Sequence, residues 1–241
     1  MANLNLTRFK ALSFDCYGTL IDWEGGILNA LEPWAASHGL ALRGDELLSA
    51  FAGVESAIQT ATPDKLYAHV LTDVLLALAR SHGVRARDDE ARAFGATVGN
   101  WPAFSDSLKA LGYLKQHYAL VILSNVDRIS FALSNAKLGV EFDLIVTAED
   151  VGSYKPNPAH FERAYSDLAA RGIARHEILH VAQSLFHDIA PANRLAQPCV
   201  WVDRRFDRPG GGATPSSEAT PDLRVTSLDE LVRLHRAQLS G

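Results

Sequence analysis

The sequence predicts an α/β fold in which a doubly wound parallel sheet carries a helical segment inserted after its first strand. Continuous apolar runs of strand length alternate with helical periodicity over the second half of the chain, which is typical of a parallel sheet with helices on both faces. Residues 25–95 show helical periodicity and contain no strand-like run. One apolar run, at residues 11–14, precedes that helical segment, which therefore separates the first strand from the others.

The expected elements follow one another in a regular order. Strand-like apolar runs occupy residues 11–14, 118–125, 142–150, 177–184 and 198–204. Helical periodicity occupies residues 27–39, 45–59, 65–83, 107–117, 128–139, 157–172 and 189–197. Residues 208–222 are rich in Gly, Pro and Ser and are expected to form a loop, and Ser227 is expected to cap a terminal helix.

The composition is that of an ordinary globular protein. Of the 241 residues, 47% are hydrophobic and 21% are charged. The net charge of −5 disfavours nucleic acid or an anionic membrane as a partner. No apolar run reaches the roughly 18 residues of a membrane span, and the first residues lack a signal-peptide pattern. Because Cys16 and Cys199 are too few for a disulfide framework, a cytoplasmic protein is expected.

Polar side chains follow four of the predicted strands at the points where those strands end. They are Asp15, the pair Ser124-Asn125, Lys155, and Ser184 with Asp188. The carboxyl ends of parallel strands meet at one edge of a sheet, where such folds bind their ligands. We therefore expect these side chains to lie together, with the helical insert covering them and excluding water.

The chemistry of these residues is coherent. A carboxylate such as Asp15 can attack an electrophilic carbon or phosphorus and form an ester or acyl phosphate. A neighbouring lysine, Lys155, keeps that carboxylate ionised and can bind an anionic substrate group. Hydroxyl, amide and backbone N–H groups at the strand ends are donors for substrate oxygens.

Four segments, FDCYGTL, LSN, YKP and VAQS with a following Asp, resemble the four motifs of the haloacid dehalogenase superfamily in order and spacing. The resemblance covers essentially the whole chain. It implies a Rossmann-like catalytic core formed by residues 1–20 and 98–241, with a helical cap formed by residues 21–97. It further implies a hydrolase that acts on a small-molecule carboxylate, and it leaves a homodimer open as the assembly.

Two positions in the motifs separate the reaction classes of the superfamily. Phosphatases resemble DxDGT, in which the second Asp protonates the leaving alcohol, whereas Tyr17 stands there in this chain. Mg²⁺-dependent members usually have an Asp where Gln183 stands, and a hard cation prefers several carboxylate oxygens. The chain therefore resembles the 2-haloacid dehalogenases, and the resemblance implies neither a metal nor another cofactor.

The resemblance assigns a role to each site residue. Asp15 attacks the substrate carbon and forms an ester, Lys155 holds its charge, and Asp188 orients Lys155 and the hydrolytic water. Thr19 is implied to position the nucleophile. The residues implied to bind the substrate are Ser124, Asn125, Tyr17 and Trp23, and those implied to support the site from behind are Ser184 and Gln183.

Departures from the dehalogenase pattern leave the leaving group open. Phe51-Ala52 stands where a cap Arg usually receives the halide, and Phe161 replaces a Tyr. An (S)-2-haloacid dehalogenase is the first hypothesis. An azetidine-2-carboxylate hydrolase, with Trp23 facing the amine and Asp22 or His187 assisting it, is the second. A phosphatase or a catalytically silent binding protein is the third.

Overall fold

The protein folds around one parallel sheet. The structure is a computed structural model that describes residues 4–208 and 210–240. The strand order in the described part is β3-β2-β1-β4-β5-β6, and every pairing is parallel. The strands are β1 (Ala11–Phe14), β2 (Ala119–Ser124), β3 (Leu144–Thr147), β4 (Ile178–Ala182), β5 (Cys199–Val202) and β6 (Leu223–Val225). This architecture confirms the predicted α/β fold. Residues 1–3, 209 and 241 of the predicted core and loop lie outside the described residues.

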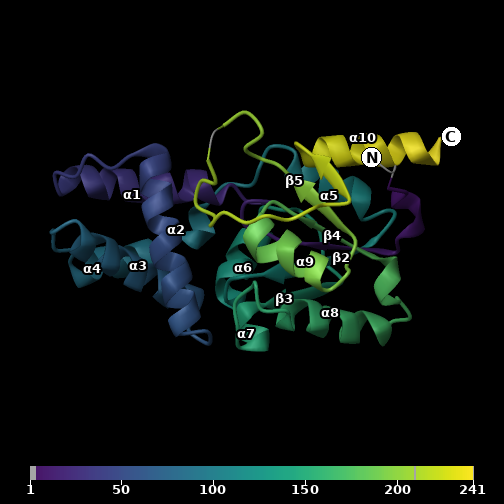
Figure 1. Cartoon of the computed structure of the whole chain (residues 1–241), viewed down its shortest axis with the longest axis horizontal. Helices are drawn as coiled ribbons and strands as arrows, with labels where there is room; N and C mark the ends of the chain where they lie inside the picture. The colour runs from purple at the N-terminus through teal and green to yellow at the C-terminus, as the bar shows by residue number, and fades with distance from the viewer. Residues whose placement is uncertain (1–3, 209, 241) are drawn as a thin grey trace.

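Helices surround the sheet and extend to one side of it (Figure 1). They are α1 (Trp23–Ser37), α2 (Gly44–Ala61), α3 (Tyr67–Ser81), α4 (Asp88–Gly95), α5 (Ser107–Leu114), α6 (Arg128–Asn135), α7 (Ala148–Val151), α8 (Ala159–Ala169), α9 (Ala190–Arg194) and α10 (Leu228–Leu239). Ser227 caps α10 as predicted, since its side chain accepts a hydrogen bond from the Glu230 backbone. Within residues 4–208 and 210–240, no helix is long and apolar enough to cross a membrane.

Alternate residues of the central strands enter two different cores. Leu12 of β1 belongs to the cluster that contains Leu111 of α5 and Leu228 of α10. Its neighbour Ala11 belongs to a second cluster that contains Phe161 of α8. Because successive strand side chains point to opposite faces, a strand that is apolar throughout must be covered on both sides. This explains why the strands were visible in the sequence as continuous apolar runs.

Three elements differ from the prediction. The strand expected over residues 142–150 ends at Thr147, because the Thr147 side chain caps the short helix α7 that starts at Ala148. The edge strand β6 was not predicted, because its three residues are too few to show periodicity; it forms by pairing Leu223 with Val200 of β5. The helix expected from residue 189 starts earlier, as a π-helical turn over Leu185–Ile189 that continues into α9. Such turns are often found at functional sites, and this one contains Asp188.

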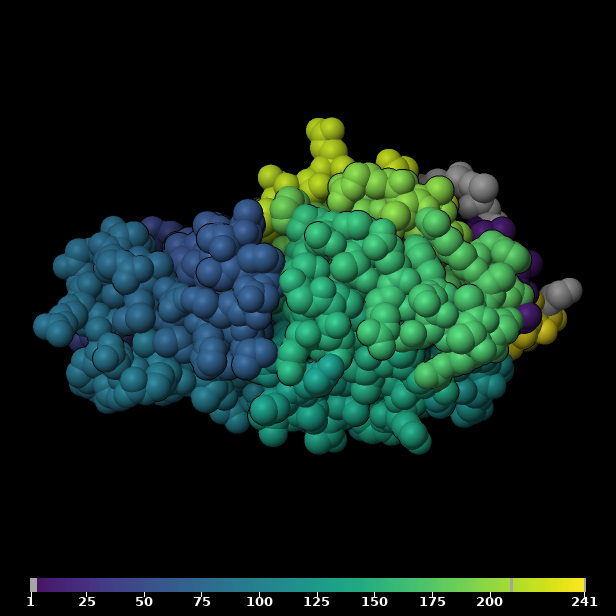
Figure 2. All heavy atoms as spheres, turned by 90° about the horizontal axis from the view of Figure 1, so that it is seen from below, coloured from purple at the N-terminus to yellow at the C-terminus, as the bar shows by residue number. Residues whose placement is uncertain are grey.

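The helices α1–α4 form a group of their own beside the sheet, between β1 and β2 in sequence (Figure 1). Their atoms lie directly against the rest of the molecule in Figure 2. A Cβ on Gly26 of α1 would lie 2.2 Å from Cδ1 of Trp101, so the Trp101 indole packs directly against the helix backbone at a position that only glycine allows. Arg205 also joins the two parts by ion pairs to Glu24 (2.6 Å) and Asp45 (2.7 Å). We refer to α1–α4 as the cap; its boundaries at residues 21 and 97 stay a prediction.

Candidate active site

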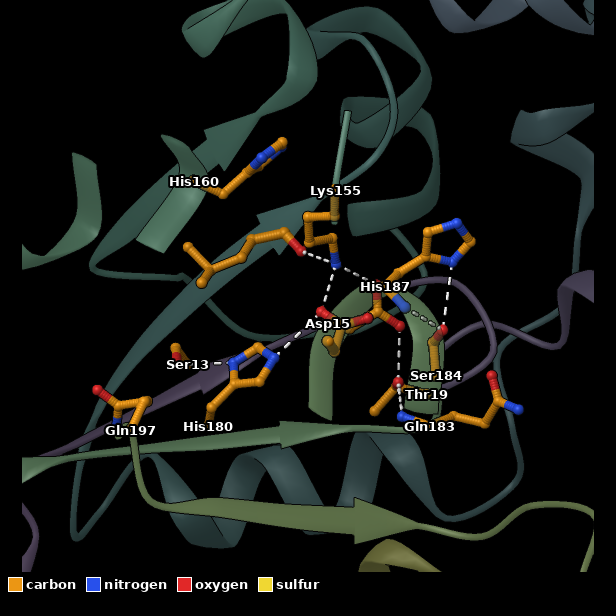
Figure 3. A network of polar contacts seen from close by, with 12 residues as sticks. Ser13, Asp15, Thr19, Lys155, His160, His180, Gln183, Ser184, His187 and Gln197 are labelled. Atoms are coloured by element: carbon orange, nitrogen blue, oxygen red, sulfur yellow. Dashed lines mark hydrogen bonds and ion pairs between the residues drawn. The ribbon is translucent and has the colours of Figure 1, made fainter. Parts of the chain in front are cut away.

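The register of the sheet gathers the predicted side chains at one edge. Phe14, the last residue of β1, pairs with Ile122 of β2 and Val181 of β4, so the three strands end at similar heights. Asp15 follows at once, and its backbone N–H donates to Val181 O at 3.2 Å. The side chains of Asp15, Lys155, Asp188 and Thr19 lie in one network, as Figure 3 shows for the labelled residues.

Lys155 is the centre of this network. Its Nζ atom donates to Asp15 Oδ1 at 2.9 Å, to Asp188 Oδ1 at 2.7 Å and to the carbonyl oxygen of Leu123 at 2.8 Å. All three of its N–H donors therefore have partners. The ammonium group and both carboxylates are buried, with Lys155 only 1% exposed. A buried charge needs partners of this kind, because desolvation alone costs several kcal/mol per ion.

Each carboxylate of the network has a second partner. Thr19 donates its hydroxyl hydrogen to Asp15 Oδ2 at 2.7 Å, and that hydroxyl oxygen accepts from the Gln183 backbone N–H at 2.9 Å. His180 Nε2 lies 3.1 Å from Asp188 Oδ1, while its Nδ1 lies 3.0 Å from Ser13 Oγ. Asp188 Oδ2 is buried and has no hydrogen-bond partner among the described residues. It remains available as an acceptor.

The two carboxylates do not share Lys155 equally. Burial would raise the pKa of Asp188, but Lys155 and the contact with His180 hold it well below its usual range. Burial raises the pKa of Asp15 above its usual value, with Lys155 and Thr19 opposing that rise. Burial would also lower the pKa of Lys155, yet the two carboxylates raise it. The lysine is therefore a fixed positive charge, and Asp15 is the more readily protonated of the two acids.

Three further predicted residues lie next to the network, and two of them hold its backbone segments in place. The side chain of Asn125 accepts from the Lys155 backbone N–H at 2.7 Å and donates to its carbonyl at 3.1 Å, so it holds the lysine segment. Ser124 is fully buried, and its Oγ has no partner among the described residues. Ser184 caps the π-helical turn: its Oγ accepts from the His187 N–H at 2.9 Å.

Tyr17, Gln183 and Trp23 line the same cavity as Asp15, and within the described residues none of them forms a hydrogen bond to its carboxylate. The Tyr17 hydroxyl turns away and contacts Ser134 Oγ at 2.8 Å. The side-chain oxygen of Gln183 is buried and unpartnered within the described residues. Trp23 begins α1, and its ring meets Phe51 of α2 edge to face, with 6.2 Å between centroids.

A small cavity of about 30 Å³ adjoins Asp15. This is space for about two waters, since one water needs roughly 10–15 Å³. The lining comprises Asp15, Tyr17, Trp23, Glu55, Gln59, Asn125, Lys155, Gln183, Ser184, His187, Asp188 and Thr214. Substrate entry therefore requires the cap and the core to separate, or their side chains to move.

Sequence reasoning missed three residues of this lining. Glu55 and Gln59 come from α2, and Thr214 comes from the Gly- and Pro-rich loop. A signal for the first two was present: the buried face of α2 is apolar at Leu47 and Phe51 and then continues, at helical spacing, with Glu55 and Gln59. Asp22, by contrast, caps α1 through the Gly25 N–H at 3.0 Å and does not line the cavity.

The residues do not fit a magnesium ion. Lys155 Nζ lies between the two core carboxylates, and the other two motif positions are Tyr17, whose hydroxyl turns away, and the neutral Gln183. In the described ranges no group of three or more His, Cys, Asp or Glu side chains is placed to hold a metal. The lining also contains no Arg; Arg204, near Thr19, forms an ion pair with Asp106 at 2.8 Å.

Known proteins are similar to this chain over most of their length. A phosphoglycolate phosphatase from Photorhabdus laumondii is 28% identical over 236 residues, which is 96% of this chain and 94% of that protein. An (S)-2-haloacid dehalogenase, 4A, from Burkholderia cepacia is 26% identical over 230 residues, 92% and 93% of the two chains. The solved L-2-haloacid dehalogenase from Xanthobacter autotrophicus superimposes with a TM-score of 0.76 at 20% identity, covering 95% and 98%.

A family model agrees with these similarities. The model for haloacid dehalogenase-like hydrolases matches residues 9–195, a range that includes β1, the cap, Lys155 and Asp188. The resemblance seen in the four motifs is thereby confirmed. The chain belongs to the haloacid dehalogenase-like hydrolases.

Proposed function

We propose that this hydrolase displaces a leaving group from a saturated carbon of a small 2-substituted carboxylate, through an ester formed on Asp15. The observation that carries the proposal is the pair of contacts on that carboxylate, Lys155 on one oxygen and Thr19 on the other. They keep a buried nucleophile aimed and charged. The acid that a phosphatase places two residues later is absent, because Tyr17 stands there and its hydroxyl contacts Ser134.

The reaction has two steps. An oxygen of Asp15 attacks C2 of the substrate, the bond from C2 to the leaving group breaks, and an ester joins Asp15 to C2. Water then attacks the ester carbonyl, releasing the 2-hydroxy acid and restoring the carboxylate. Asp188 Oδ2, which is buried and without a partner among the described residues, is suited to accept a hydrogen bond from that water and so to orient it. Lys155 balances the charge throughout.

An (S)-2-haloacid is the first substrate to test. Its support is the similarity to the (S)-2-haloacid dehalogenase from Burkholderia cepacia, which extends over 92% of this chain. The small cavity also favours a substrate of few atoms. The displaced group in this case is a halide.

A strained ring amine such as azetidine-2-carboxylate is a second candidate. Two carboxylates, those of Asp15 and Asp188, line the cavity with one cation, Lys155. A substrate that carries an ammonium group besides its carboxylate would balance this charge better than a haloacid would. The Trp23 ring offers a face for such a cation.

Substrate assays with a nucleophile variant test the proposal. (S)-2-Chloropropionate, fluoroacetate, azetidine-2-carboxylate and p-nitrophenyl phosphate are each incubated with the wild type and with Asp15→Asn. We expect turnover of a 2-substituted carboxylate by the wild type only, without added metal. Efficient Mg²⁺-dependent hydrolysis of the phosphate ester alone would contradict the proposal and favour the activity of the phosphatase from Photorhabdus laumondii. Turnover of none of the four would favour a binding protein.

A single-turnover reaction in H₂¹⁸O tests the intermediate directly. Water attacks the ester carbonyl in our scheme, so the label should enter the Asp15 carboxylate, detected by mass spectrometry of the peptide. Label in the product alone after the first turnover would show direct attack of water on the substrate.

A further inference from the structure

The cap places one buried carboxyl group in the cavity without a cation beside it. Glu55 lies on the buried face of α2, is 2% exposed and lines the cavity together with Asp15. Its Oε1 accepts a hydrogen bond from the Tyr67 hydroxyl of α3 at 2.6 Å. Within residues 4–208 and 210–240, Glu55 forms no ion pair, and Oε2 has no hydrogen-bond partner. Asp15, in the same cavity, has Lys155 at 2.9 Å.

A carboxyl group in this environment favours its protonated form. Desolvation by burial raises the pKa of Glu55 to about 7, and the hydrogen bond from Tyr67 opposes that rise. In that form the group is a hydrogen-bond donor, whereas an ionised carboxylate only accepts. Two carboxyl groups with opposite roles, set by their surroundings, are a recurrent arrangement in hydrolases.

We propose that protonated Glu55 donates its hydrogen to the departing group, so that the site prefers leaving atoms that accept strong hydrogen bonds, fluoride or an amine nitrogen, over chloride or bromide. This inference rests on the Asp15 displacement proposed above. As the C2–F bond breaks, its electron pair goes to fluorine, which accepts the hydrogen bond from Glu55. Water later supplies OH to the Asp15 ester carbonyl and a hydrogen to the product oxygen, and one proton is released with the fluoride.

For an amine, the same donor transfers its proton. The electron pair of the broken C2–N bond goes to nitrogen, which takes the hydrogen of Glu55 and becomes an ammonium group. The proton that is freed when Asp15 returns to a carboxylate restores Glu55. Chloride and bromide are far weaker acceptors and gain little from such a donor.

The fall in rate at alkaline pH should report on Glu55, because the other titratable groups that face it do not change their protonation state there. Burial raises the pKa of both tyrosines, Tyr67 from α3 and Tyr154 after α7, so both stay protonated. Across the cavity are Asp15, Lys155, His187 and Asp188. Burial lowers the pKa of His187 to about 4, so it is neutral above pH 5. Asp15 must be ionised to attack, and its titration therefore limits the rate on the acid side.

Substitutions at position 55 test the proposal with 2-fluoropropionate and 2-bromopropionate as paired substrates. Glu55→Ala removes the donor and should lower kcat/KM on the fluoro acid about a hundredfold, the usual effect of losing one such donor. On the bromo acid the loss should be less than about tenfold. Glu46→Gln, an exposed carboxylate on the same helix, serves as the control and should change neither. Equal losses on both halides would overturn the proposal.

The pH profile provides a readout that a purely structural role would not move. Wild-type kcat/KM on the fluoro acid should fall above pH 7 as Glu55 loses its proton. Glu55→Gln keeps a neutral N–H donor and should show no such fall. Tyr67→Phe removes the bond that stabilises the carboxylate, so the fall should move to higher pH. An alkaline limb that persists unchanged in Glu55→Gln would overturn the proposal.

The two proposals fail in distinguishable ways. Single-turnover ¹⁸O labelling with 2-bromopropionate should mark Asp15 in both the wild type and Glu55→Ala. No label in the wild type would contradict the Asp15 scheme itself, and this inference with it. Label in both proteins combined with equal losses on the two halides would remove only the role of Glu55. If azetidine-2-carboxylate is the only substrate turned over, the same pH profiles are measured with it.

Discussion

The core edge, which is the edge of the sheet where β1, β2 and β4 end, buries Asp15 beside the cavity, and the cap buries Glu55 beside the same cavity. The partners of the two carboxyl groups differ. Asp15 at the end of β1 meets an ammonium group and a hydroxyl group. Glu55 on α2 meets a single tyrosine hydroxyl. Burial penalises the charge of both, yet only Asp15 has a cation to compensate. The same residue chemistry is therefore suited to a nucleophile in one region and to a hydrogen donor in the other.

The difference has a structural origin. Lys155 reaches Asp15 because the parallel strands end at one edge and Asn125 holds the lysine backbone there. In the described part of the chain, the cap places no such cation beside Glu55, whose side chain contacts the Tyr67 hydroxyl instead. Both arrangements make predictions for stability as well as for rate.

The largest expected effect comes from removing the cation of the core edge. Lys155→Met leaves Asp15 and Asp188 buried without their common partner, which should lower the free energy of unfolding by about 3–5 kcal/mol at pH 7. The two acids of the folded variant have raised pKa values, so the loss should shrink as the pH falls towards 4. Urea unfolding at several pH values measures it.

Lys115→Met is the matched control for that variant. Lys115 pairs with Asp143 at 2.6 Å on the surface, where both side chains are about one-third exposed. Removing this pair should cost no more than about 1 kcal/mol. If the two variants were equally destabilised, the core network would contribute no more than a surface ion pair.

A second, smaller effect should have the opposite sign. Folded Glu55 has a pKa of about 7 against 4.5 unfolded, so the folded state is penalised increasingly as the pH rises from about 4.5 to 7. Glu55→Gln removes the charge and keeps an oxygen for Tyr67. The variant should match the wild type at pH 4 and exceed it by up to about 3 kcal/mol at pH 8. Thermal and urea unfolding at both pH values measure the difference.

The outcome also tests the comparison between the two regions. A Gln variant that is less stable than the wild type at pH 8 would mean that Glu55 is ionised and favourably paired in the folded state. The region would then resemble the core edge, and the proposed donor would be lost.

The smallest of the three stability effects concerns the hydroxyl on Asp15. Thr19→Val preserves shape but removes the donor to Asp15 and the acceptor for the Gln183 N–H. Hydrogen bonds to charged groups contribute about 1.5–3 kcal/mol, so the free energy of unfolding should fall by that amount. Thr97→Val, which breaks a hydroxyl bond to the neutral Phe94 carbonyl, should cost less. Equal losses would indicate that Asp15 is protonated in the folded protein.

The core of this protein could be predicted from its sequence because the relevant signals are local. A buried parallel strand must be apolar on both faces, so β1, β2 and β4 were visible as runs. The carboxyl ends of parallel strands lie at one edge of the sheet. The sequence therefore predicted that Asp15 and Lys155 lie close together, as they do in the structure. The edge strand β6 was missed because three residues carry no period and pair only when β5 is beside them.

The cap side of the site was decided by tertiary structure alone. Helical periodicity shows that one face of α2 is buried. It does not show that the two polar residues at the end of that face, Glu55 and Gln59, meet a cavity whose other lining comes from Asp15 after β1 and from segments as distant in sequence as Thr214. The pairing of Asn125 with the Lys155 backbone and the arrival of Thr214 from a Gly-rich loop have the same origin. Burial and the absence of a neighbouring cation determine the protonation of Glu55, and both arise only when the cap lies against the sheet.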